Sequence, residues 1–353
     1  MAREGITTMA PTHSPFVLPL AALLGLLGLS ACDGLGACTV DADPDWTGGG
    51  DGGAPAVQGP PHPIVLAHGM FGTDRYANVV DYWFEIPAAL ADAGHTQVFV
   101  TAVDPLNNST VRGAQLAEQI EDILAYTGHD QVVIVGHSQG GLDARVVAHD
   151  HPDMVAAVVT LGTPHGGSPL GQIFVDLLEN PVGQPFVGLL EALIGPVVFD
   201  EYTDETDLFE SLHMFTPEGV AAFDAAYPDA PSVDYYAIAG RSSGASSSVA
   251  VCQVPGGAPD FISRWDGERD PLVELAIAEP LVSPFGLTVH DGVVPTHAQK
   301  HGTFLGCIPA DHLDEVGQLF GDGPGTHPLW GKNDFDYQEF FVGLADFIRA
   351  EGY

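Results

Sequence analysis

The chain has 353 residues, of which 45% are hydrophobic, so it can form one large folded domain or two small ones. Its formal net charge is −37, from 47 acidic and 10 basic residues. Such a surface repels polyanions, which excludes nucleic-acid binding and attraction to anionic lipid headgroups. The excess of acid suits either a salt-rich medium or the plain solubility of an exported protein, and charge does not separate these two readings.

The N-terminal segment predicts export. Residues 16–32 form an apolar run, FVLPLAALLGLLGLSAC, which has the length of a signal peptide and ends in small residues. It is too short for a comfortable membrane-spanning helix. Its last four residues, Leu29 to Cys32, resemble the bacterial lipobox, in which the cysteine after the cleavage site is lipidated. We therefore expect residues 1–31 to be a lipoprotein signal and Cys32 to carry a lipid anchor at the cell envelope. An ordinary cleaved signal of a secreted protein is the alternative.

Residues 32–61 are rich in Gly, Pro and Asp and have almost nothing to bury, which predicts a flexible linker ahead of a folded domain at 62–353. Export implies an oxidising compartment, so cysteines can pair. Cys252 and Cys307 both lie inside the predicted domain and are the expected disulfide. If Cys32 carries lipid, Cys38 in the linker is the unpaired cysteine.

A regular alternation of strands and helices begins at residue 62. Buried strands are predicted at 63–69, 96–103, 131–136, 155–164 and 233–240, and helices at 79–94, 111–128, 140–151 and 336–350. Continuous apolar strands that alternate with helices indicate a parallel sheet covered on both faces. The alternation breaks over about 168–230, where helical segments such as 170–180 and 185–199 follow one another without a strand. This stretch predicts a helical cap over one end of the sheet.

The stretch VIVGHSQGG, residues 133–141, has the features of a nucleophile elbow. Ser138 follows a hydrophobic strand and precedes a helix, and the glycines on either side let the backbone turn tightly. The pattern G-x-S-x-G is weak by itself, and a glycine-rich helix start with a capping serine is the competing explanation. The strand before it, the helix after it and a second motif upstream favour Ser138 as a nucleophile.

That second motif is His68-Gly69-Met70-Phe71-Gly72, just after the first predicted strand. Attack on an ester carbonyl creates an oxyanion, which needs two backbone N–H donors already in place. We expect one donor from Gln139, the residue after the nucleophile, and the other from Met70 in this early loop. An ordinary strand-to-helix turn is the alternative.

Four stretches together resemble the secreted triacylglycerol lipases of Pseudomonas and Burkholderia: PIVLAHGMFGTDRYANVVDYWFEIP, VIVGHSQGG, LGTPHGGS and DHLDEVGQLFG. The likeness is close over 63–90, 131–168 and 288–322, and loose in the cap. It implies an α/β-hydrolase fold with a cap that acts as a lid. It also implies hydrolysis of acylglycerols at a lipid–water interface, and in some cases dependence on a dedicated foldase.

The resemblance also implies the rest of a catalytic triad. The family's acid lies in an Asn-Asp-Gly motif, which matches His290-Asp291-Gly292 with histidine in place of asparagine, so Asp291 is the expected acid. A plain turn aspartate is the alternative, since Asp-Gly is a strong turn signal. The family's base is the histidine of its His-Leu-Asp-Glu motif, here His312. The chain order Ser, Asp, His is that of α/β-hydrolases.

In the resembling lipases a calcium ion steadies the histidine loop, and calcium prefers oxygen ligands. By that likeness the ligands here would be Asp314, Gln318, the carbonyl near Asp322, and Asp270, with Asp266 as an alternative to Asp270. An acid-rich helix start is the competing explanation. Asp311 and Glu315 receive no role and are expected to be solvated. The family's disulfide uses a cysteine soon after the acid motif, whereas Cys307 comes later.

The main interpretation is thus a triacylglycerol lipase that works through an acyl-enzyme on Ser138. A carboxylesterase for short soluble esters, or an acyltransferase with the same triad, would have the same site residues. A catalytically inactive, lipid-anchored binding protein is the hypothesis from another class, and the intact candidate triad argues against it.

Overall fold

Six strands form one parallel sheet in the order β4-β1-β5-β6-β7-β8. Their bounds are β1 (Ile64–Ala67), β4 (Val98–Thr101), β5 (Val132–His137), β6 (Val155–Leu161), β7 (Asp234–Gly240) and β8 (Thr303–Ile308). All neighbouring pairs run parallel, so the carboxyl ends of all six strands meet at one edge. Strands β1, β5 and β6 are buried along their whole length, which explains their unbroken apolar sequences.

The computed structural model describes residues 59–353 apart from 73–74, 77–79, 180–207, 243–248, 267, 269, 271–274, 276–277, 284–285, 287, 319–324 and 328–330. The predicted signal segment, the predicted lipidation site Cys32, the cysteine expected to be unpaired, Cys38, and almost all of the linker lie outside the described residues. The predicted helical segment 185–199 does so as well. No helix among the described residues is long and apolar enough to cross a membrane.

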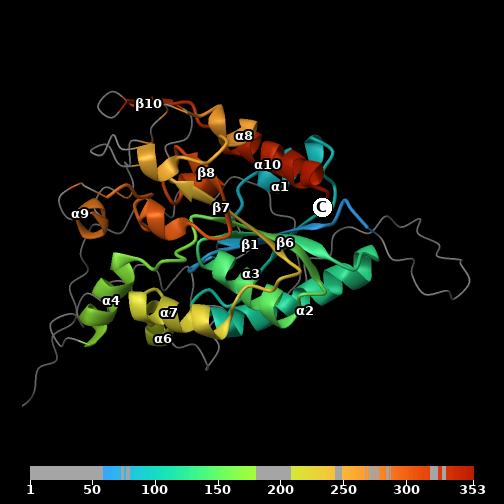
Figure 1. The fold of residues 1–353 in the computed structure, drawn as a ribbon, viewed down its shortest axis with the longest axis horizontal. Helices are drawn as coiled ribbons and strands as arrows, with labels where there is room; N and C mark the ends of the chain where they lie inside the picture. The colour runs from blue at the N-terminus through green and yellow to red at the C-terminus, as the bar shows by residue number, and fades with distance from the viewer. Residues whose placement is uncertain are drawn as a thin grey trace, which may run out of the picture. The chain divides into compact units, whose positions relative to one another are not determined.

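Helices cover both faces of the sheet, as predicted (Figure 1). Helices α2 (Ser109–Thr127) and α3 (Gln139–Asp150) pack on one face, where Leu116 and Val147 contribute to an apolar core cluster. Helices α1 (Ile86–Asp92) and α10 (Tyr337–Glu351) pack on the other face, where Trp83 and Phe340 belong to a second cluster. The two faces thus have separate cores divided by the sheet.

The predicted cap appears between β6 and β7. Its described part consists of α4 (Pro169–Glu179), α6 (Leu208–His213) and α7 (Pro217–Ala226), which gather at one end of the sheet in Figure 1. Met214, Phe215 and Phe223 of this segment form a small apolar cluster with Leu142 and Val146 of α3. The base of the cap is therefore packed on the helix that follows the predicted nucleophile.

Two local predictions were wrong or incomplete. The helix predicted over 79–94 begins only at Ile86, because Val80–Asp81 (β3) pairs with Arg75–Tyr76 (β2) and Glu85 has a left-handed φ of 55°. Strand β8 was not predicted, although it forms the sheet edge beyond β7.

Short elements connect β7 to α10: η2 (Val249–Cys252), α8 (Asp260–Ser263), α9 (Glu279–Val282), η3 (Thr296–Gln299), η4 (Asp314–Val316), β9 (Gly325–His327) and β10 (Gly331–Asn333). The predicted acid and the predicted base both lie in loops among them.

Candidate active site

The nucleophile elbow lies between β5 and α3, at the carboxyl edge of the sheet. Ser138 has φ 54° and ψ −127°, a strained conformation for a residue with a side chain. Close packing leaves no room beside it. A Cβ on Gly140 would lie 2.2 Å from the carbonyl oxygen of Ala67, and one on Gly136 would lie 2.5 Å from that of Gly140. The glycines are therefore required by sterics, and Ser138 is the residue that this turn presents.

The structure brings Ser138, His312 and Asp291 together, although they lie far apart in the chain. His312 Nε2 lies 2.9 Å from Ser138 Oγ, and His312 Nδ1 lies 2.8 Å from Asp291 Oδ2. Since a carboxylate can only accept, the Nδ1–H of His312 donates to Asp291, and Nε2 is left to accept the serine proton. Asp291 is fully buried and His312 is 7% exposed.

The loop after β1 lies beside the nucleophile, as predicted. A Cβ on Gly69 would lie 2.7 Å from Cβ of Ser138. Within the described part of the chain, neither the N–H of Met70 nor that of Gln139 donates to a backbone carbonyl. Both predicted donors thus sit next to Ser138 and have no backbone acceptor there.

Arg112 holds this loop through hydrogen bonds to its carbonyls, a role that the sequence did not reveal. Its guanidinium donates to the carbonyl oxygens of His68 at 2.6 Å and Gly69 at 3.3 Å, and to Asp143 Oδ2 at 2.8 Å. Arg112 and Asp143 are both fully buried. Burial raises the pKa of Asp143, while the Arg112 charge opposes that rise. Because Arg112 binds the carbonyl of Gly69, the N–H of Met70 in the same planar peptide unit points away from Arg112.

A second buried chain of hydrogen bonds joins this loop to the histidine loop. Tyr82 Oη accepts the N–H of Gly69 at 3.0 Å and lies 2.6 Å from His137 Nδ1. His137 Nε2 lies 3.0 Å from Glu315 Oε2, and the His137 ring packs 4.7 Å from that of His312. Burial lowers the pKa of His137 and raises that of Glu315. Burial therefore opposes the charged form of both partners of this hydrogen bond.

The expectation that Asp311 and Glu315 are solvated was wrong, because both side chains are fully buried. Asp311 Oδ1 accepts the N–H groups of Leu313 and Asp314, and the Asp311 N–H donates to Asp270 Oδ2 at 2.8 Å. Their tight packing around the loop could not be read from a stretch that looks like an acidic helix start.

Three of these carboxylates form one buried group. Asp270, Asp311 and Asp314 each offer an oxygen within 4.8 Å of the others, and Asp311 Oδ2 has no hydrogen-bond partner within the described chain. Burial, with Asp270 next, raises the pKa of Asp311 well above its ordinary value. Clustered carboxylate oxygens of this kind fit a hard divalent cation.

Not every predicted ligand belongs to this group. Asp270 and Asp314 do, and the alternative Asp266 is exposed. Asp311 belongs to it but was not predicted. Gln318 is half-buried, and its backbone N–H donates to the carbonyl of Leu313 at 3.1 Å. Asp322 lies outside the described residues.

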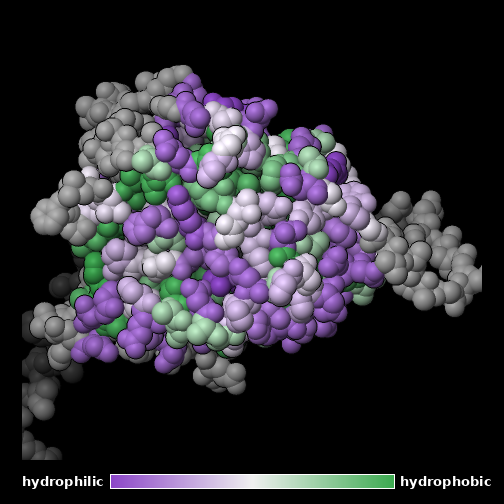
Figure 2. All heavy atoms as spheres, viewed as in Figure 1, coloured by the Kyte–Doolittle hydropathy of each residue, from purple (hydrophilic) through white to green (hydrophobic). Residues whose placement is uncertain are grey.

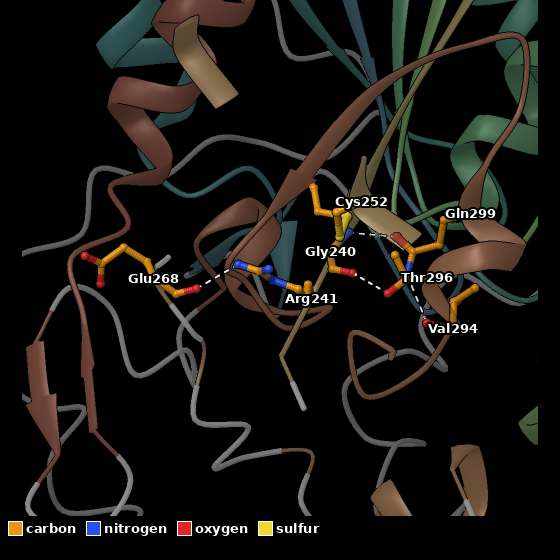
Figure 3. The surroundings of a disulfide bond; sticks show 8 residues. Gly240, Arg241, Cys252, Glu268, Val294, Thr296 and Gln299 are labelled. Carbon is orange, nitrogen blue, oxygen red and sulfur yellow. Dashed lines mark hydrogen bonds between the residues drawn. A yellow bond between two sulfur atoms is a disulfide. The ribbon is translucent and has the colours of Figure 1, made fainter. Parts of the chain in front are cut away.

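A disulfide joins Cys252 of η2 to Cys307 of β8, the pair expected from the sequence (Figure 3). Cys307 lies five residues before His312, on the strand that leads into the histidine loop. The bond ties the segment after β7 to that strand.

The comparisons with known proteins concern the fold and the family of the chain. A family model described as the α/β-hydrolase fold matches residues 62–185. The chain is 33% identical over 273 residues to a triacylglycerol lipase of Vibrio cholerae, which covers 74% of this chain and 81% of that protein. It is 32% identical over 212 residues to a triacylglycerol lipase of Pseudarthrobacter phenanthrenivorans, 58% of this chain. That match spans 64% of the relative's length, and the match to the Burkholderia plantarii lipase spans 57%.

Among solved structures, a lipase of Staphylococcus hyicus superposes with a TM-score of 0.55 at 17% identity, over 84% of this chain and 99% of that one. At this identity the likeness concerns the fold alone, and it confirms the predicted fold class. The extent of the Vibrio match, together with the elbow and the parallel sheet, confirms the predicted family: the chain belongs to the bacterial triacylglycerol lipases of the α/β-hydrolase superfamily.

Proposed function

We propose that the protein is a serine carboxylic ester hydrolase that cleaves acylglycerols. The observation that carries this proposal is the chain of hydrogen bonds from Ser138 Oγ through His312 to the buried Asp291, at 2.9 and 2.8 Å. This arrangement lets a serine at an elbow act as a nucleophile, with the histidine as base and the aspartate as its orienting partner.

In the reaction, Ser138 Oγ attacks the ester carbonyl carbon while His312 Nε2 takes the serine proton. The N–H groups of Met70 and Gln139 stabilise the resulting oxyanion. His312 then gives the proton to the leaving alcohol, and the acyl group stays on Ser138. A water molecule attacks this acyl-enzyme, loses a proton to His312 and releases the fatty acid, after which the proton returns to Ser138.

The described part of the cap supports a long-chain substrate. Leu170, Ile173, Phe174 and Leu177 of α4 are large apolar side chains that remain half-buried. In Figure 2 hydrophobic residues gather at the end of the molecule where α4 and α9 lie, while much of the remaining visible face is hydrophilic. Leu281 of α9 is 44% exposed. An apolar surface beside a hydrolase site suits contact with acyl chains or a lipid–water interface.

The test compares emulsified triolein with dissolved tributyrin. We expect long-chain activity that rises when the emulsion forms, and a loss of about 10⁴-fold or more in kcat for Ser138→Ala, as for nucleophiles of other serine hydrolases. Activity on tributyrin alone would favour the short-chain carboxylesterase. Transfer of the acyl group to an added alcohol in preference to water would favour the acyltransferase. Ser138→Ala with full activity would refute the mechanism.

A calcium ion held by Asp270, Asp311 and Asp314 is part of this proposal. Its charge would neutralise three buried carboxylates and so hold the loop that carries His312 in place. Gln318 and the backbone near Asp322 would complete the ligand set expected from the family.

We also propose that the mature protein is exported and anchored through a lipid on Cys32, with Cys38 left unpaired. Radiolabelled palmitate should enter the wild type but not Cys32→Ser. Refolding of the denatured protein without any helper tests dependence on a foldase, and full recovery of activity would exclude such a partner.

A further inference from the structure

Asp291 has a partner besides His312 that no sequence motif marks. Gln299 lies in η3, eight residues after the acid, and is fully buried. Its Nε2 donates to Asp291 Oδ2 at 3.0 Å, the same oxygen that receives the Nδ1–H of His312 at 2.8 Å.

The amide of Gln299 is fixed at both ends. Its second N–H donates to the carbonyl of Val294 at 2.9 Å, and its Oε1 accepts the N–H of Gly240 at 2.8 Å. Figure 3 shows Gln299 between Gly240 at the end of β7 and the loop that carries Val294. A flipped amide would place its oxygen against a carboxylate and a carbonyl, so only one orientation satisfies these partners.

This bond is one of four that backbone N–H groups, the amide and the imidazole make to the acid. Asp291 Oδ1 accepts the N–H groups of Val293 at 2.8 Å and Val294 at 2.6 Å. Oδ2 accepts from Gln299 and His312. A carboxylate offers about four lone-pair directions, and here four donors use them. The carboxylate therefore cannot rotate without losing a bond, and His312 occupies one of its four directions.

The structure assigns Gln299 the role of positioning residue for the catalytic acid: its amide locks the Asp291 carboxylate so that Oδ2 aims the His312 ring at Ser138. Among the described residues the Gln299 side chain bonds to Gly240, Asp291 and Val294 and not to Ser138, so it acts on the triad through Asp291. This inference rests on the proposed serine hydrolase function.

The test replaces Gln299 by Met, which keeps the length and removes both donors. Thr296→Val is the matched control, because Thr296 is fully buried in the same η3 and donates to the carbonyl of the same Gly240 at 3.1 Å, but makes no bond to Asp291. We expect Gln299→Met to lower kcat about 10- to 100-fold, the range for a lost buried hydrogen bond to a charged group, with KM nearly unchanged. Thr296→Val should lose stability and keep kcat.

Proton NMR gives a readout that a purely structural role would not move. The downfield resonance of the His312 Nδ1 proton, which reports its bond to Asp291, should shift in Gln299→Met and stay in place in Thr296→Val. Equal losses of kcat in both variants, or an unchanged kcat and resonance in Gln299→Met, would overturn the assignment.

If Gln299→Met does not fold, Gln299→Leu decides. Its branched apolar side chain is of similar volume and has no hydrogen-bond donor, so kcat should fall about as far as expected for Gln299→Met. Retained kcat in this variant would overturn the assignment. Wild-type hydrolysis and its loss in Ser138→Ala are measured alongside, so that a failure of the proposed function is distinguished from a failure of this inference.

Discussion

The two halves of the site are held in place by different means. The elbow that carries Ser138 depends on backbone sterics, in which glycines allow strands and a helix to approach to contact. The half that carries Asp291 and His312 depends on side-chain hydrogen bonds between distant segments, a carboxylate cluster and a disulfide. The first arrangement can be recognised from a short sequence motif, whereas the second depends on contacts that form only when the chain has folded.

The largest effect is expected at Arg112, which links the oxyanion loop to α3. Arg112→Met leaves Asp143 as an uncompensated buried charge and frees the carbonyls of His68 and Gly69. Breaking a buried ion pair in this way costs about 3–5 kcal/mol of unfolding free energy, measurable by urea denaturation, and kcat should fall as well. Arg264→Met is the control, because Arg264 pairs with Glu339 at the surface and such pairs contribute at most about 1 kcal/mol. Equal losses would contradict the role of Arg112.

Gly140→Ala tests the steric half directly. The added Cβ would lie 2.2 Å from the carbonyl oxygen of Ala67, a backbone atom that cannot rotate away. Overpacking of this kind costs about 1–3 kcal/mol, and the shift of α3 should also reduce kcat by moving Ser138. Gly59→Ala meets nothing within 4 Å and is the control. A fully active Gly140→Ala would show that the elbow can accommodate an added methyl group despite its close packing.

Calcium removal tests the half of the site that carries Asp291 and His312. Because a bound ion stabilises only the folded state, EDTA should lower the unfolding free energy by about 2–3 kcal/mol relative to calcium at a hundredfold excess over its Kd. Asp311→Asn should reduce this dependence. A melting temperature that changes with neither EDTA nor added calcium would contradict the proposed calcium site.

The smallest effect is a pH dependence from His68, in the oxyanion loop. Burial, with the nearby Arg112 charge next, lowers the pKa of His68 to about 3. The unfolded chain protonates this histidine near its ordinary pKa of about 6.5. Below that pH the unfolded state binds a proton that the folded state does not, so this contribution is complete above about pH 6.5 and is lost as pH falls toward 3.

The slope from this one histidine is at most about 1.4 kcal/mol per pH unit. His68→Gln should flatten the decline in unfolding free energy between pH 6.5 and 4. His297→Gln, which changes an exposed side chain, should leave the wild-type slope as it is. An unaltered slope in His68→Gln would mean that this histidine does not titrate as its burial implies.

Sequence reasoning predicted five of the six sheet strands, the elbow and the cap, because each depends on local patterns. Ser138 could be assigned from the strand before it and the helix after it. The helix predicted to begin at residue 79 was wrong because a turn at Glu85, with its positive φ, overrides the apolar spacing.

The remaining features depend on contacts between distant segments. Arg112 reads as an ordinary position on an amphipathic helix, and nothing in its neighbours reveals the carbonyls that it holds. Asp311 and Glu315 read as solvated acids and are buried instead. Gln299 lies in a stretch without a recognisable motif. A single sequence gives no signal for such contacts.

The all-parallel sheet places the cap and the chemistry in separate parts of the chain. The chain leaves the sheet after Leu161, builds the cap and returns at Asp234, while Ser138 precedes this excursion and Asp291 and His312 follow it. Both ends of the insertion are fixed by neighbouring, directly paired strands. The cap, which we propose contacts the acyl chain, is therefore one continuous insertion, so that substrate range and reaction type are encoded in separate stretches of the chain.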